Sequence, residues 1–182
     1  MSLRHVFIAT AAFGVVISVP LAARNPMVGG AAMYPTMTIV QNALNSKDHT
    51  TLVSAVKAAG LVDTLKGAGP FTVFAPTNEA FAALPAGTID TLLKPANKAQ
   101  LTKILTYHVV AARVDAAALM GMINKDGGKH AIKTVAGDTL TASAQGGNVV
   151  LTDAKGGMST VTQVDVFQKN GVIHVVDKVL LP

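Results

Sequence analysis

A histidine and a carboxylate interrupt an apolar run near the end of the chain, in the stretch GVIHVVDKVLLP at residues 171–182. His174 and Asp177 could be half of a catalytic triad, in which an acid orients a basic imidazole. They could also be two metal ligands, since zinc binds imidazole and carboxylate, or polar residues that a sheet accommodates. The choice between these roles decides whether the chain is predicted to be an enzyme.

The geometry of a β-strand separates the two side chains, because successive residues point to opposite faces. His174 and Asp177 are an odd number of residues apart, so without a bulge they cannot form a dyad or bind one metal ion. The residues that share the face of His174 are apolar: Val172, Val176 and Leu180. We therefore predict that His174 is buried and hydrogen-bonded to a distant group.

A second candidate pair, Tyr107 and His108, stands in LTYHVV at the predicted end of a helix. A histidine there can interact with the terminal carbonyls, and a tyrosine can bury its ring while its hydroxyl finds a partner. Neither role needs catalysis. The other histidines show no ligand spacing among themselves: His5, His49 and His130. We predict no metal site and no cofactor.

No pattern in the sequence indicates an enzyme. A nucleophile would be expected on a sharp turn such as G-x-S-x-G, or a pair of carboxylates in one site. None of the serines has the flanking glycines, and Glu79 is the only glutamate. The glycine pairs also lack the spacing that brings phosphate to a helix N-terminus.

Composition excludes further classes. Hydrophobic residues make up 50% of the chain and charged residues 14%, which favours a folded domain over disorder. Aromatic residues make up only 4% and tryptophan is absent, so stacking surfaces for bases or sugars are lacking. The net charge of +5 comes from basic residues scattered singly, which argues against nucleic acid as a partner and allows weak contact with anionic surfaces.

The N-terminus resembles a secretion signal. Arg4 precedes an uncharged run from Val6 to Ala23, and we predict a signal peptide at 1–23, with cleavage after Ala32 as the later alternative. A retained membrane anchor is the alternative. Residues 24–36, rich in glycine, alanine and proline, are predicted to be a flexible leader. We expect secretion to the periplasm, the cell surface or the medium, with no disulfide because cysteine is absent.

The remaining residues, 37–182, are predicted to form one α+β domain. Helical spacing is seen at 37–67, where Asp48 is a candidate N-cap and Gly60 a candidate stop. A buried strand is predicted at 71–74, and helical spacing returns after it. From residue 130 onward, short alternating runs separated by glycine predict a mainly antiparallel sheet.

Three stretches in order resemble the fasciclin, or FAS1, domain family: TVFAPTNEAFAAL from Thr72, ILTYHVV from Ile104 and NGVIHVVDKVLLP from Asn170. In that family they are the H1 box, the Tyr-His motif and the H2 box. One departure is VVAARV after His108, where many members have Pro-Gly. The resemblance implies a FAS1 fold, in which a wedge of β-strands packs with short helices. It implies structural roles for eight residues: Phe74, Pro76, Thr77, Phe81, Asn170, Gly171, His174 and Asp177.

The resemblance also implies a function. FAS1 domains are mostly adhesion modules and not usually enzymes, and in animal members receptor contact is attributed to the Tyr-His motif and to an Asp-Ile pair before the H2 box. These fall on Tyr107 and His108, and on Asp165 and Val166. The alternative for the last two is that Asp165 caps a turn and Val166 lies in the core.

We therefore expect a secreted or surface-associated adhesion module that binds a cell-surface or matrix protein or polysaccharide. Some FAS1 proteins carry small molecules, so an extracellular carrier of a lipid or a carotenoid-like apolar molecule is the alternative. An aliphatic groove between the helices and the β-wedge would be its binding site.

Overall fold

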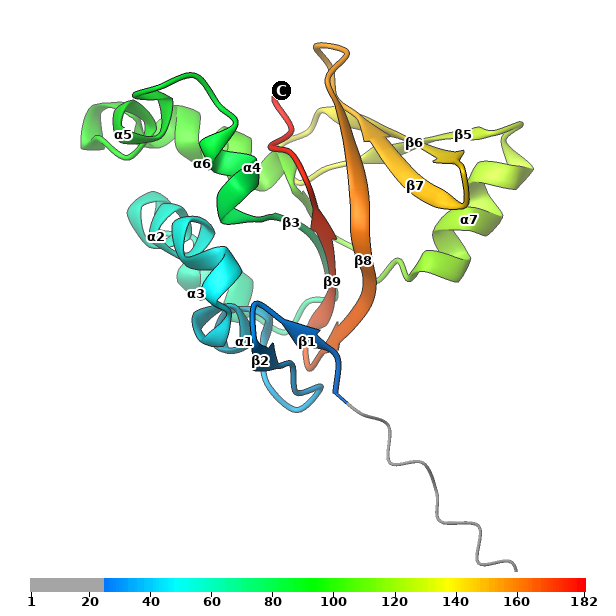
Figure 1. Ribbon diagram of the computed structural model, residues 1–182, viewed down its shortest axis with the longest axis horizontal. Helices are drawn as coiled ribbons and strands as arrows, with labels where there is room; N and C mark the ends of the chain where they lie inside the picture. The colour runs from blue at the N-terminus through cyan, green and yellow to red at the C-terminus, as the bar shows by residue number, and fades with distance from the viewer. Residues whose placement is uncertain (1–24) are drawn as a thin grey trace, which may run out of the picture.

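The computed structural model describes residues 25–182, so the predicted signal peptide lies outside the described range. Six helices, α1–α6, lie on one side of a central group of strands, and a β-meander with helix α7 lies on the other (Figure 1). The fold is the α+β arrangement that the sequence predicts, with a mainly antiparallel sheet.

The helices are short, and most are joined by turns of a few residues. Their bounds are α1 Ile39–Asn45, α2 Thr50–Ala59, α3 Val62–Lys66, α4 Asn78–Ala82, α5 Thr88–Leu92, α6 Lys98–Tyr107 and α7 Ala116–Lys125, with single 3₁₀ turns at Lys47–His49 and Pro95–Asn97. Within residues 25–182, none of them has the length and apolar character needed to cross a membrane.

Seven strands form the main sheet in the order β4-β3-β9-β8-β7-β6-β5. Their bounds are β3 Phe71–Pro76, β4 Val109–Val110, β5 Lys129–Lys133, β6 Thr139–Gln145, β7 Asn148–Thr152, β8 Met158–Gln168 and β9 Gly171–Val176. Strands β3 and β9 pair in parallel, and every other pair in this sheet is antiparallel. The predicted C-terminal strand is shorter than expected, because it ends at Val176 and the chain continues as a tail.

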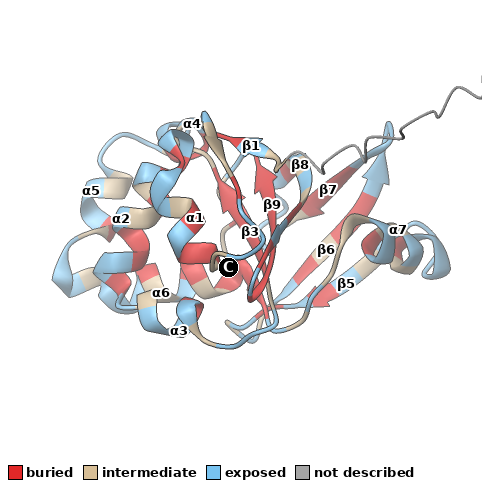
Figure 2. Cartoon of the chain, turned by 90° about the horizontal axis from the view of Figure 1, so that it is seen from below, coloured by how far each residue is buried: buried red, intermediate tan, exposed pale blue. Residues whose placement is uncertain are grey.

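Alternation along β3 and β9 divides the apolar interior into two cores. Val73 and Ile173 belong to the core under α1–α6, whereas Phe74 and Val176 belong to the core under α7 and the meander. Both strands are buried between these layers (Figure 2). Polar residues on β9 therefore have no route to solvent, and each must find a partner inside the protein.

The predicted flexible leader differs from the structure. Residues Met27–Val28 (β1) and Ala31–Ala32 (β2) form a hairpin, and Val28 and Met33 are buried in the core under α1. The backbone N–H of Lys47 donates to the carbonyl oxygen of Gly29 at 3.1 Å, which joins the hairpin to the helices. Isolated apolar residues among glycine and alanine have no period, so the sequence gives no sign of this packing.

Candidate functional site

His174 is buried, as predicted, with 1% of its surface exposed. Its Nε2–H donates to the carbonyl oxygen of Val114 at 2.8 Å, and its Nδ1 accepts the backbone N–H of Asp165 at 3.4 Å. The ring of Phe74 stacks against it with centroids 5.7 Å apart. Burial lowers the pKa of His174, although the hydrogen bond to Val114 opposes the shift. The imidazole is a neutral, satisfied link between β9, β8 and the segment before α7.

Asp177 lies beyond the end of β9 and shares no partner with His174. Its Oδ1 accepts the hydroxyl of Ser159 at 3.1 Å and the backbone N–H of Thr160 at 2.7 Å. His174 and Asp177 therefore act separately. Asp177 fixes the start of the C-terminal tail to β8.

Replacing His174 with alanine should lower the free energy of unfolding by about 1–3 kcal/mol. The carbonyl oxygen of Val114 and the backbone N–H of Asp165 would both lose their hydrogen-bond partner. Thermal unfolding followed by circular dichroism measures the loss. His130 is the matched control, since it pairs with Asp126 in a partly exposed site, and His130→Ala should change stability little. An unchanged melting temperature for His174→Ala would show that the histidine has no structural role.

Tyr107 and His108 are both buried at the end of α6. The hydroxyl of Tyr107 donates to the carbonyl oxygen of Thr139 and accepts the N–H of Ala154, each at 3.0 Å. The Nδ1–H of His108 donates to the carbonyl oxygen of Ile104 at 2.8 Å. Burial raises the pKa of Tyr107 and lowers the pKa of His108 to about 4.

The Nε2 of His108 accepts the backbone N–H of Leu180 at 3.0 Å, so the Tyr-His motif holds the turn after β7 and the C-terminal tail. A side chain without exposed surface cannot touch a partner bound to this conformation. The direct contact that the resemblance implies for Tyr107 and His108 is therefore not available here, and their role is support.

The H1-box residues build the junction between β3 and α4. Phe74 and Phe81 are buried in different cores, on opposite sides of the sheet. Pro76 ends β3, and the hydroxyl of Thr77 caps α4 by accepting the N–H of Ala80 at 3.3 Å. The H1 box thus fixes the direction in which the chain leaves the central strands.

Asn170 and Gly171 join the helices to the start of β9. The Oδ1 of Asn170 accepts the N–H of Ile39 at 3.0 Å, and its Nδ2 donates to the carbonyl oxygens of Leu65 and Gly67 at 2.7 and 2.9 Å. Gly171 lies directly against the backbone of Phe71, its partner in the parallel pair.

The Asp-Ile pair of the resemblance falls on a bulged part of β8. The pairing of β8 with β9 is irregular between Val161 and Val166, and Asp165 has a φ of 57°. This left-handed conformation strains most residues and is tolerated best by glycine, asparagine and aspartate. The Oδ1 of Asp165 accepts the N–H of Ala116 at 2.7 Å, at the start of α7.

Only one residue of this pair is open to solvent. Val166 has 0% exposure and lies in the core under α1, as the alternative held, while Asp165 is half-buried. The carboxylate of Asp165 bonds to the first residue of α7, whose N-cap is Asp115, and not to the turn after β8. Val166 therefore cannot contact a partner directly in this conformation, whereas Asp165 can.

Sequence reasoning missed the exposed residues beside this pair. Val164 is 42% exposed and Phe167 is 36% exposed, although both belong to a strand. The guanidinium of Arg113 lies 5.0 Å from the centroid of the Phe167 ring, a cation–π contact. We call Arg113, Val164, Asp165 and Phe167 the bulge surface. The bulge, which the sequence does not reveal, reverses the alternation along β8, so that Phe167 points outward while Val166 and Gln168 are buried.

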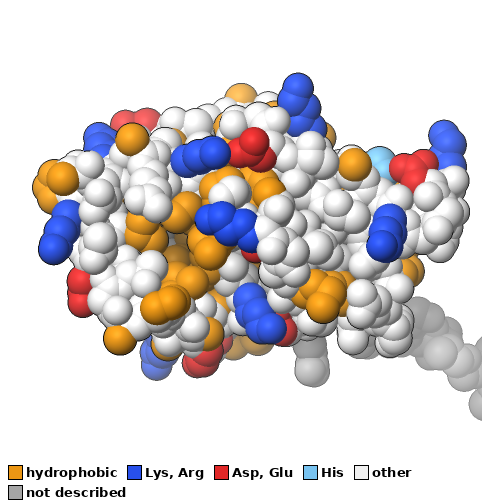
Figure 3. Space-filling model, turned by 90° about the horizontal axis from the view of Figure 1, so that it is seen from above, with side chains coloured by type: hydrophobic (Ala, Val, Ile, Leu, Met, Phe, Trp, Pro, Cys, Tyr) orange, Lys and Arg blue, Asp and Glu red, His pale blue; other side chains and the backbone are white. Residues whose placement is uncertain are grey.

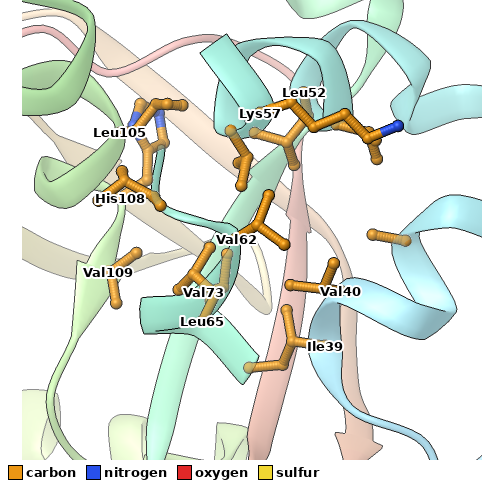
Figure 4. A pocket seen from close by; sticks show the side chains of 14 residues that line it. Ile39, Val40, Leu52, Lys57, Val62, Leu65, Val73, Leu105, His108 and Val109 are labelled. Atoms are coloured by element: carbon orange, nitrogen blue, oxygen red, sulfur yellow. The ribbon is translucent and has the colours of Figure 1, made fainter. Parts of the chain in front are cut away.

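Two hollows among residues 25–182 bear on the carrier alternative. An open groove of about 400 Å³ lies between α5, α6 and the C-terminal tail, on the face shown in Figure 3. An enclosed cavity under α1–α3 is lined by aliphatic side chains, with His108 and Lys57 at its margin (Figure 4). The cavity measures only about 40 Å³, whereas small-molecule sites usually measure about 300–1,000 Å³. It therefore has no room for the lipid or carotenoid of the alternative function.

The titratable groups do not gather into a metal site within residues 25–182, where no three His, Asp or Glu side chains are placed to hold an ion. His108 and His174 each use both ring nitrogens in hydrogen bonds to the chain, whereas the buried His49 bonds to nearby Ser46 through Nδ1 and its Nε2 has no partner. The arrangement is therefore suited to holding strands and loops in place.

Comparisons with known proteins agree with this reading of the motifs. The profile of the Fasciclin domain matches residues 47–182. Protein sll1483 of Synechocystis sp. is 47% identical, over 87% of this chain and 81% of the relative. Immunogenic protein MPB70 of Mycobacterium bovis is 34% identical, over 94% of this chain and 90% of the relative. A solved FAS1 domain pair from the insect cell adhesion molecule Fasciclin I is 19% identical with a TM-score of 0.73, over 81% of this chain and 52% of that one. This chain belongs to the fasciclin (FAS1) domain family.

Proposed function

We propose that the protein is a secreted or surface-associated adhesion module that binds a cell-surface or matrix protein or polysaccharide and catalyses no reaction. The observation that carries the proposal is the fasciclin domain itself. Its profile matches residues 47–182, and the chain resembles in fold about half of a FAS1 domain pair from a cell adhesion molecule. Its buried histidines are engaged in structural hydrogen bonds, which fits a binding role.

The bulge surface is the contact region that we propose. Val164 and Phe167 offer apolar area next to the carboxylate of Asp165 and the guanidinium of Arg113. Aromatic and arginine side chains are enriched where proteins bind one another. Because His174 and Ala116 both hold Asp165, this surface keeps its shape before a partner arrives.

A pull-down of the mature domain against intact cells and their surface polymers tests the proposal. The Asp165→Asn variant is informative, since asparagine tolerates the same backbone conformation and keeps an oxygen for the N–H of Ala116. We expect binding that persists at high salt and weakens in Asp165→Asn. Binding that disappears with salt alone, or no binding to any surface, would indicate that adhesion is not the function.

Exported protein should begin near Arg24, since the sequence predicts cleavage between residues 23 and 32. The structure favours the early site, because cleavage after Ala32 would remove the hairpin and take the buried side chain of Val28 from the core. N-terminal sequencing of exported protein measures this. A mature protein that starts at Met33, or an intact N-terminus recovered with membranes, would contradict the prediction.

A further inference from the structure

The open groove on the face of Figure 3 has the dimensions of a ligand site. It measures about 400 Å³, within the usual range for small-molecule sites. Its walls are the turn between α4 and α5, helices α5 and α6, the turn after β7 and the C-terminal tail. Most of its lining is apolar and includes Leu84, Leu92, Ile104 and Leu181. In Figure 3, hydrophobic side chains gather in a hollow that has basic side chains around it.

Polar side chains outside the lining hold the walls of the groove in place. Asp153 is buried, and its Oδ1 accepts the backbone N–H groups of Lys155 and Gly157 at 2.9 and 2.8 Å. Its Oδ2 accepts the N–H of Leu181 at 3.0 Å. Together with the bond from Leu180 to His108, these contacts fix the tail against the turn. The groove is therefore formed before a ligand binds, which favours affinity.

The charged side chains that line the groove are both basic, and Pro182, the last residue of the sequence, lines it as well. Lys103 and Lys155 line it, and no aspartate or glutamate does. Lys103 forms an exposed ion pair with Asp138 at 3.2 Å, a contact weak enough to exchange for a ligand. Among residues 25–182, Lys155 forms no ion pair with a carboxylate side chain. The groove thus combines an aliphatic wall with a cationic rim.

We propose that this groove binds a free fatty acid. The acyl chain lies along Leu84, Leu92 and Ile104, and the carboxylate is held by Lys155 and Lys103. An acyl chain matches a lining without aromatic residues, and a single carboxylate matches two lysines that share the groove with the uncharged polar residues Thr88 and Gln100. This site is separate from the bulge surface, so the inference is independent of adhesion and either can fail alone.

A fluorescence titration of the mature domain with cis-parinaric acid tests the site. We expect saturable binding that palmitate displaces and palmitate methyl ester displaces poorly, because the ester has no charge for the lysines. The Lys103→Ala/Lys155→Ala variant should bind about tenfold more weakly. Lys57→Ala is the matched control, since Lys57 lies at the margin of the enclosed cavity, and its affinity should be unchanged.

Amide chemical-shift mapping with palmitate locates the ligand independently of the variants. We expect shifts at residues of the groove, such as Thr88, Gln100 and Lys155. Absence of binding, equal displacement by acid and ester, or shifts confined to α1–α3 around the enclosed cavity would each overturn the proposal.

Discussion

Replacing Gly171 with alanine should prevent native folding, or lower the free energy of unfolding by at least about 4 kcal/mol. A Cβ atom at this position would overlap the carbonyl oxygen of Phe71 and lie 2.8 Å from its carbonyl carbon. The obstacle is backbone, which cannot rotate away as a side chain can. Relief would require separating β3 from β9, the parallel pair that divides the two cores. Soluble yield and urea-induced unfolding measure the effect.

Gly121 provides the control for this substitution. It lies in α7, and a Cβ there would meet no heavy atom within 4 Å. Gly121→Ala should be neutral or stabilise the protein by about 0.5–1 kcal/mol, because alanine favours helix. If Gly171→Ala were as stable as Gly121→Ala, the close approach of β3 and β9 described here would be incorrect.

Acidification should destabilise the domain strongly between pH 6.5 and pH 4. Burial lowers the pKa values of His49, His108 and His174, and that of His108 falls from 6.5 to about 4. In this window the unfolded chain binds protons that the folded chain does not, so the free energy of unfolding decreases as pH falls. For His108 alone, the lowering of the pKa from 6.5 to about 4 corresponds to a loss of about 3 kcal/mol in the free energy of unfolding.

Urea denaturation across this pH range measures the loss, which should be absent above about pH 7, where the histidines are neutral in both states. The His108→Gln variant should show a shallower dependence on pH, whatever its stability at neutral pH. His130→Ala, at a partly exposed site beside Asp126, is the control variant. Stability that stays constant down to pH 4.5 would show that the histidines are not buried in the neutral form.

Local signals were sufficient for much of the fold. Gly60 ends α2 in the left-handed conformation with φ 74°, as predicted, and Thr77 of the H1 box caps α4. These features depend on a few neighbouring residues, so the sequence contains their cause. Asp48 was predicted wrongly as a cap, since it lies within a 3₁₀ turn and α2 begins at Thr50 without a side-chain cap.

The candidate site depended on contacts between distant residues, and the sequence predicted it less well. Asp165 bonds to Ala116, 49 residues away, and His174 to Val114, 60 residues away. Strand alternation predicted that His174 is buried but could not name its partners. The bulge in β8 moved Phe167 outward, and no local pattern predicts a bulge without its partner strand.

Binding of the mature domain to intact cells and isolated surface polymers, with the bulge surface altered, tests the central claim most directly. The Val164→Ser/Phe167→Ser variant removes exposed apolar area from the bulge, and Met158→Ser removes a 55% exposed side chain from the other end of β8. We predict that all three proteins fold alike, that the double variant binds at least about tenfold more weakly, and that Met158→Ser binds as the unaltered protein does. Equal binding by all three would contradict adhesion through the bulge surface.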